Sequence, residues 1–93
     1  VPIKLYIGGC TDTVGNPSDN LNLSARRAKA IARWLRQNGY DRPIFTHGFG
    51  ESLLAVSTPD STDNADNRRA IYYVGSYPPP AGSGVPAVNW SAL

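Results

Sequence analysis

The sequence predicts a small α/β domain, of the α+β kind, in which a strand, a helix and two further strands build a mixed sheet. Three observations support this fold class: alternating apolar residues over 1–7, helical periodicity over 16–39, and two further strand-like segments at 44–47 and 70–74. A strand, a crossover helix and a second strand favour a right-handed parallel unit. The third strand can then pair in the antiparallel direction.

The first predicted strand covers residues 1–7. Every second residue there is apolar, which is the period of an extended strand with one buried face. Pro2 costs little at a strand start, because no ladder hydrogen bond is needed from it. The pair Gly8-Gly9 then predicts the end of the strand, since glycine holds an extended conformation poorly.

The predicted helix runs from Asn16 to Gly39. Asn16 suits the N-cap, and Pro17 suits the first helical position, where a missing N–H group costs nothing. Gly39 follows Asn38, a pattern typical of the residue that ends a helix in the left-handed conformation.

One apolar stripe follows this predicted helix. Apolar residues recur at steps of three and four from Leu23 to Leu35, which is the period of a helix with one buried face. We expect Trp34, which lies on this stripe, to belong to the core. The basic residues of the segment lie mostly off the stripe and are expected to face solvent: Arg26, Lys29, Arg33 and Arg36.

Two more strands and two irregular segments follow the helix. Residues 44–47 predict a short second strand, and 70–74 predict a third, rich in aromatic and β-branched residues. Residues 48–52 are predicted to form a turn, and 57–67 a polar loop.

The composition changes after residue 76, where proline and glycine become frequent. We therefore predict a domain over 1–76 and a Pro/Gly-rich tail over 77–93, which is extended and poorly ordered unless Trp90 docks on the domain. Three strands and one helix leave one face of the sheet poorly covered. We expect either that further elements precede Val1 or that a partner chain covers this face.

Composition also limits the function classes. The net charge of +2 is mild, and five of the nine basic residues lie in the predicted helix, a weaker bias than nucleic-acid binders show. The apolar segments are far shorter than the ~18 residues that cross a bilayer. No signal peptide is visible before Ile3, as is also the case for a trimmed chain.

Metal and cofactor sites find little support in the sequence. The single Cys10 excludes an internal disulfide, and one cysteine with one histidine cannot build a zinc site. We assign His47 a structural role. The acidic run over 60–66 is interpreted as a solvated loop, because it lacks the glycine and the closing glutamate of a calcium loop. No cofactor is predicted.

The most informative charged pair is Asp12 with Arg27. Asp12 follows the first predicted strand, and loops at that end of a βαβ unit face the crevice where ligands tend to bind. Arg27 lies on the following helix. A carboxylate and a guanidinium facing one crevice can hold an ammonium and a carboxylate of one ligand. The alternative is that the two side chains form a salt bridge with each other.

Four motifs of this chain resemble those of the OmpA-like peptidoglycan-binding family. Residues 9–15 read Gly-Cys-Thr-Asp-Thr-Val-Gly, where the family has Gly-His-Thr-Asp-x-x-Gly, and residues 20–28 contain Asn-x-x-Leu-Ser-x-x-Arg-Ala. Residues 48–52 are similar to the family's Gly-Tyr-Gly-Glu segment, and 67–69 to its Asn-Arg-Arg segment. The motifs follow in the same order over residues 3–74.

This resemblance implies an OmpA-like β-α-β-β mixed-sheet sandwich in which the family's first strand and helix are missing. The chain would then be a truncated piece, or two copies would complete each other as a homodimer. Cys10 stands where the family usually has histidine and is expected to be a small buried apolar filler rather than a reactive thiol.

The resemblance also implies a ligand, the meso-diaminopimelate residue of the peptidoglycan stem peptide. Asp12 would pair with its ammonium group, and Arg27 would hold the carboxylate on the same carbon. Either Arg68 or Arg69 would face the site or brace the Asp12 loop. The ligand-binding residues implied are Thr11, Asp12, Asn20, Leu23, Arg27 and Arg68. The protein would anchor an envelope protein to the cell wall, in the periplasm at the outer membrane of a Gram-negative bacterium.

Three other functions are alternatives to wall binding. A nucleotide-binding loop is disfavoured, because the glycines match neither phosphate-binding pattern and Asp12 and Asp19 would repel phosphate. A protein–protein assembly module, or a dimerising fragment without its own ligand affinity, stays open. An enzyme is not predicted, since no nucleophile, base and orienting group occur together.

Overall fold

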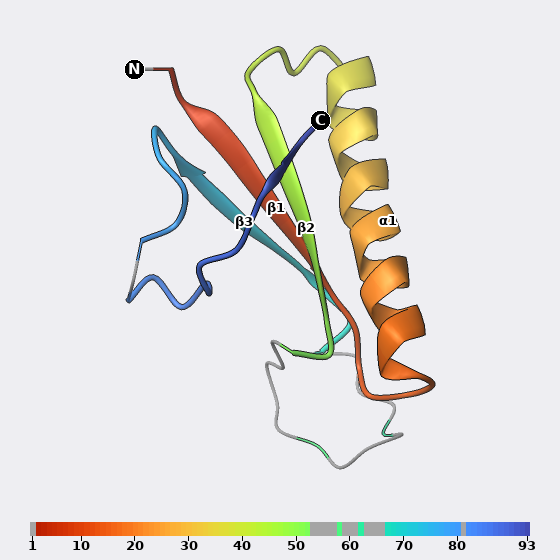
Figure 1. Ribbon diagram of the computed structural model, residues 1–93. Coiled ribbons are helices and arrows are strands. Elements are labelled where there is room, and N and C mark those ends of the chain that lie inside the picture. Colours follow the sequence, from red (N-terminus) through yellow and green to blue (C-terminus); the bar gives the residue numbers. More distant parts are fainter. Residues whose placement is uncertain (1, 53–57, 59–61, 63–66, 81) are drawn as a thin grey trace.

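The computed structural model describes residues 2–52, 58, 62, 67–80 and 82–93. Within these residues the chain forms one helix and a four-stranded sheet (Figure 1). Their bounds are β1 Lys4–Cys10, α1 Pro17–Gln37, β2 Ile44–Gly50, β3 Ala70–Gly75 and β4 Ser91–Ala92. The strand order is β3-β1-β2-β4. β1 and β2 are parallel, and β3 and β4 pair antiparallel with β1 and β2 respectively, so the predicted mixed α/β fold is confirmed.

Both ends of α1 follow the prediction. The side chain of Asn16 accepts a hydrogen bond from the backbone N–H of Ser18 at 2.8 Å, and Pro17 is the first helical residue. At the other end Asn38 is the C-cap, and Gly39 adopts a φ of 95°. That left-handed conformation carries little strain only for glycine.

α1 lies very close to the sheet because glycines stand beneath it. A Cβ atom at Gly9 would meet the backbone oxygen of Ser24 at 2.2 Å, and one at Gly48 would meet the backbone nitrogen of Ala25 at 2.5 Å. The prediction that Gly8-Gly9 ends the first strand was therefore wrong. β1 continues through both glycines to Cys10, because glycine here allows another backbone to approach.

The buried face of α1 is made of small side chains, and this corrects the expected position of Trp34. Asn20, Ser24, Ala28 and Ala32 are buried, whereas Trp34 is 61% exposed. Trp34 lies about 200° around the helix from Ala32, at 3.6 residues per turn. The core cluster consists of Leu5, Ile7, Ala28, Ala32 and Ile44, with Ile31, Leu35 and Tyr40 packed against it.

β2 is longer than predicted and contains a segment that was expected to be a turn. It runs on through Gly48 and Phe49 to Gly50, and the turn begins only at Glu51. Gly48 permits this because the strand continues directly beneath α1. Most of the predicted 57–67 loop, including nearly all of the acidic run over 60–66, lies outside the described residues.

The face of the sheet opposite α1 carries a cluster of rings, which we call the aromatic cluster. Trp90 from the C-terminal segment docks there, with ring centroids 5.3 Å from Tyr6, 5.8 Å from His47 and 5.9 Å from Phe49. The members are Tyr6, Phe45, His47, Phe49, Tyr73 and Trp90. β4 follows directly and pairs with β2, so the docking required for order in the tail is present. The boundary after residue 76 stays a prediction.

Within the described part of the chain, no helix combines the length and the apolar character required to cross a membrane.

Replacing Trp90 should destabilise the fold, whereas replacing Trp34 should not. Trp90→Ala removes the ring that joins the tail to the aromatic cluster, and we expect a loss of about 2 kcal/mol in the free energy of unfolding. Trp34→Ala is the matched control, because its ring is mostly exposed, and should change stability by less than about 0.5 kcal/mol. Urea unfolding followed by circular dichroism measures both. Equal effects of the two replacements would contradict the docking of the tail.

Candidate functional site

The candidate site lies where β1 and β2 end and β3 begins. Cys10 pairs with Gly50, and Gly9 pairs with Ala70, so these three chain segments meet at one edge of the sheet (Figure 1). α1 starts beside the same edge. In parallel units this edge is where ligands usually bind, because the loops that leave the strands gather there.

Asp12 is held firmly in the loop that follows β1. Its Oδ1 accepts a hydrogen bond from the backbone N–H of Val14 at 3.1 Å, and its Oδ2 forms a salt bridge with Nη1 of Arg68 at 2.6 Å. The side chain of Asp12 is only 9% exposed, and that of Arg68 is 39% exposed. A partly buried, charge-assisted contact of this length fixes the direction of the carboxylate.

Asn20 braces the same loop from the first turns of α1. Its side-chain nitrogen donates to the backbone oxygen of Val14 at 2.8 Å and also contacts Oε2 of Glu51 at 3.4 Å. Asn20 is 8% exposed, so these contacts satisfy a buried amide. The amide therefore ties the start of α1 to the Asp12 loop.

Ser24 joins α1 to the end of β2. Its hydroxyl accepts a hydrogen bond from the backbone N–H of Gly50 at 2.8 Å and donates to the backbone oxygen of Leu21 at 2.8 Å. Gly50 in turn accepts from the backbone N–H of Thr11 at 2.8 Å. Helix, loop and strand are thus connected by a short series of hydrogen bonds.

All six residues predicted for the ligand site line one pocket. Its volume is about 340 Å³. Among the described residues, its lining is formed by Thr11, Asp12, Val14, Asn20, Leu23, Arg27 and Arg68. Thr11 and Asn20 mainly support the structure of this pocket. Thr11 is buried, and its hydroxyl donates to the backbone oxygen of Asp12 at 3.0 Å. The amide of Asn20 is likewise buried and bonded to the backbone of Val14.

The two charged residues singled out from the sequence face the same pocket without pairing with each other. Among the described residues the guanidinium of Arg27 has no salt-bridge partner, whereas Asp12 pairs with Arg68. The alternative of a simple Asp12–Arg27 salt bridge is therefore wrong for this structure. The pocket offers one carboxylate and two guanidinium groups, which can contact opposite charges of one ligand.

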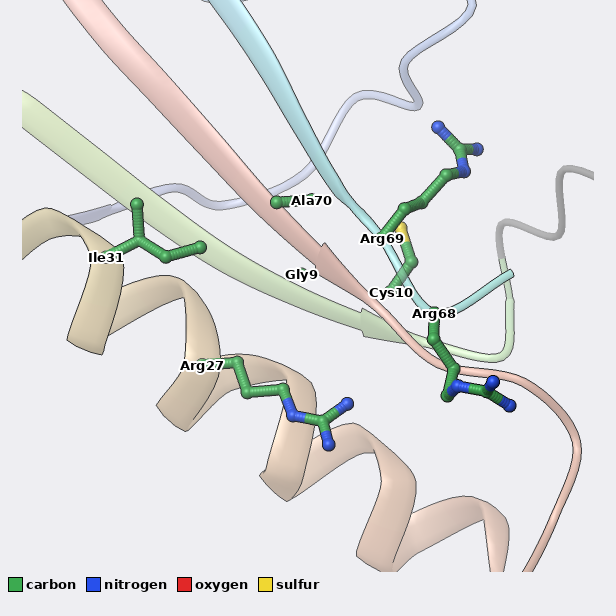
Figure 2. A pocket seen from close by; sticks show the side chains of 7 residues that line it. All are labelled: Gly9, Cys10, Arg27, Ile31, Arg68, Arg69 and Ala70. Carbon is green, nitrogen blue, oxygen red and sulfur yellow. The ribbon is translucent and has the colours of Figure 1, made fainter. Parts of the chain in front are cut away.

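Arg68, rather than Arg69, faces Asp12. In Figure 2 the two neighbouring side chains leave the chain in different directions, and that of Arg69 extends away from α1. Arg27 and Arg68 also line a second cavity of about 270 Å³ beside the first. Of the two arginines that the sequence left open, Arg68 is the one that contacts Asp12, and its role toward a ligand stays a prediction.

Cys10 and His47 have the structural surroundings expected for them. Cys10 is a buried free thiol, and burial raises its pKa, an effect that the charge of Arg69 partly opposes. Such a thiol has little thiolate at neutral pH. Burial lowers the pKa of His47, a member of the aromatic cluster. In the described residues, His, Cys, Asp and Glu side chains form no group of three suited to a metal ion.

Sequence reasoning missed three residues that shape the pocket: Val14, Ser24 and Glu51. Val14 lines the pocket directly, and its backbone groups bind both Asp12 and Asn20. Ser24 and Glu51 lie within the motifs over 20–28 and 48–52, so they were quoted but given no role. Only the distances between α1, β2 and the loop reveal that role.

Comparison with known proteins matches residues 2–69 to the OmpA family. The chain is 36% identical over 69 residues to a peptidoglycan-associated lipoprotein of Haemophilus influenzae, and 35% identical over 69 residues to that of Pasteurella multocida. It is also 37% identical over 70 residues to outer membrane protein A of Bordetella avium. Each match covers 73% of this chain.

The matches cover a smaller share of the relatives. They include 45% and 46% of the two lipoproteins and 36% of the outer membrane protein. The chain therefore spans less than half the length of the curated relatives that it matches. Every residue that lines the first pocket falls within the matched range.

Proposed function

This chain belongs to the OmpA family, and we propose that it binds peptidoglycan non-covalently through the zwitterionic end of meso-diaminopimelate. The single observation that carries the proposal is the convergence of Asp12, Arg27 and Arg68 on one pocket. These groups come from a loop, from α1 and from the segment before β3. A ligand with an ammonium and a carboxylate on one carbon matches this set of charges.

In the proposed complex Asp12 accepts hydrogen bonds from the ammonium group. Its carboxylate lines the pocket and is held in place by contacts with Val14 and Arg68. Arg27, which has no salt-bridge partner in the described part of the chain, receives the carboxylate. Two parallel N–H···O bonds from its guanidinium fix the orientation of the ligand as well as its charge.

Rigidity of the loop supports the same proposal. The contacts of Asp12 and Asn20 hold the carboxylate in place before a ligand arrives. A site that is already ordered loses less conformational entropy on binding. Even so, one small head group gives limited affinity. The strands of the cell wall present the same peptide many times, so several binding events together raise the overall affinity.

The names of the relatives support a role at the cell envelope. Two are called peptidoglycan-associated lipoproteins and one is called outer membrane protein A. We propose that this chain anchors an envelope protein to the cell wall in the periplasm, beside the outer membrane of a Gram-negative bacterium. The proposed role requires a held ligand and no catalysis.

Charge variants of the pocket test the proposal. Asp12→Asn keeps the shape and the acceptor for Val14, and Arg27→Ala removes the guanidinium. Each should weaken binding of the tripeptide L-Ala-γ-D-Glu-meso-diaminopimelate by about tenfold or more, which is ~1.4 kcal/mol. Arg26→Ala is the matched control, because Arg26 is exposed and does not line the pocket. Isothermal titration calorimetry measures the affinity of each variant.

A matched peptide with L-lysine as third residue tests the zwitterion itself. Within a stem peptide the lysine side chain ends in an ammonium group alone, so it lacks the partner for Arg27. We expect the wild-type chain to bind this peptide much more weakly. Equal affinity for both peptides, or undiminished binding by Arg27→Ala, would contradict the proposed function.

A second candidate function, assembly with another copy of the chain, is favoured by the edge of the sheet. β3 is an edge strand, and Tyr72 and Val74 on it are 58% and 61% exposed. Exposed apolar side chains beside unpaired strand edges promote pairing with another chain. Light scattering should then detect dimers that Tyr72→Lys abolishes. A monomer at high concentration would exclude this function.

A further inference from the structure

A second cavity adjoins the first pocket, and the two share Arg27 and Arg68. Asp12 is absent from the lining of the second cavity. Figure 2 shows Arg27 extending from α1 and Arg68 from the segment before β3. The remaining lining residues of this cavity, about 270 Å³ in volume, are Gly9, Cys10, Ile31, Arg69 and Ala70.

The charges around the second cavity are predominantly positive. Three of the residues that line it are arginines, Arg27, Arg68 and Arg69, and none of its lining residues in the described part of the chain is acidic. Asp12 pairs with Arg68 at 2.6 Å and the proposed head group occupies Arg27, so Arg69 supplies the positive charge that remains for a second anion. A concave surface with excess positive charge concentrates anions, and planar guanidinium groups select carboxylates.

Apart from Arg69, the rest of the described lining is small or apolar and close to the backbone. Ile31 packs beside the core on α1, and Ala70 begins β3 opposite Gly9. These residues provide contact with a small apolar group and no further charge. The ligand that suits the cavity therefore carries a carboxylate next to a group about the size of a methyl.

We propose that the second cavity binds a second carboxylate of the stem peptide, on the residue next to diaminopimelate. This inference rests on the proposed function, because the zwitterionic head group occupies the first pocket. Two carboxylates are available, that of a C-terminal D-alanine and the α-carboxylate of D-glutamate. The apolar lining favours D-alanine, whose methyl group contacts Ile31 and Ala70.

Calorimetry on the wild-type chain with three tetrapeptides distinguishes the two sources. The probes are L-Ala-γ-D-Glu-meso-diaminopimelate-D-Ala, the same peptide with a C-terminal amide, and the same peptide amidated at the glutamate α-carboxylate. The C-terminal amide should bind about tenfold more weakly, since it loses a charge-assisted contact. Amidation of glutamate should have no effect.

Each result has a distinct meaning. A loss on amidation of glutamate alone would overturn the D-alanine assignment. Equal affinity for all three peptides would overturn the second binding site while leaving the proposed function intact. Failure of every peptide to bind would overturn the proposed function and this inference with it.

Ala70→Leu provides an independent test, because it fills the second cavity and does not line the first. The variant should bind the free acid and the C-terminal amide equally, at the affinity of the wild-type chain for the amide. Ala30→Leu, at an exposed position of α1, is the matched control and should keep the tenfold difference expected from one charged contact. Circular dichroism verifies that each variant is folded. A folded Ala70→Leu variant that keeps the difference would contradict the proposal.

Discussion

The close contact between α1 and the glycines of the two parallel strands determines where the side chains of the pocket lie. Gly9 and Gly48 leave room for the backbone of α1 around Ser24, at a distance that no larger residue permits. Arg27 stands one turn further along the same helix. Its distance from the Asp12 loop therefore depends on a backbone contact, and not on the long side chain alone.

Around this contact, hydrogen bonds and a salt bridge connect separate segments of the chain. Ser24 binds Gly50, and Asn20 binds the backbone of the Asp12 loop. Arg68 then contacts Asp12 from the segment before β3. Because the bond between Ser24 and Gly50 is buried, breaking it leaves the backbone N–H group of Gly50 without a partner, which costs about 1–3 kcal/mol. These contacts fix the position of the Asp12 carboxylate on the pocket that Arg27 also lines.

Local signals made much of this arrangement predictable. The N-cap at Asn16, the terminal Gly39 and the antiparallel third strand follow from residue type and spacing. The set of residues around the pocket followed from motif resemblance, and their convergence on one cavity is a property of the fold. The local sequence does not indicate which residue each charged side chain pairs with. The pairing of Asp12 with Arg68 is therefore known only from the three-dimensional structure.

The failed predictions share a physical cause. Trp34 was assigned to the core because large apolar residues were given most weight, yet the close contact selects small residues such as Ala28 and Ala32. Gly9 was taken as a strand end because its role depends on Ser24, which is distant in sequence but adjacent in space. Non-local contacts of this kind leave no periodic pattern.

The most direct test is the stability and ligand affinity of Gly9→Ala. Its added Cβ would collide with Ser24, so we expect the free energy of unfolding to fall by about 2 kcal/mol or more, with weaker binding of the tripeptide by the folded fraction. Gly39→Ala controls for glycine replacement, since it adds only left-handed strain of about 1 kcal/mol in open space. A Gly9→Ala chain with wild-type stability and affinity would contradict the role given to the helix–sheet contact.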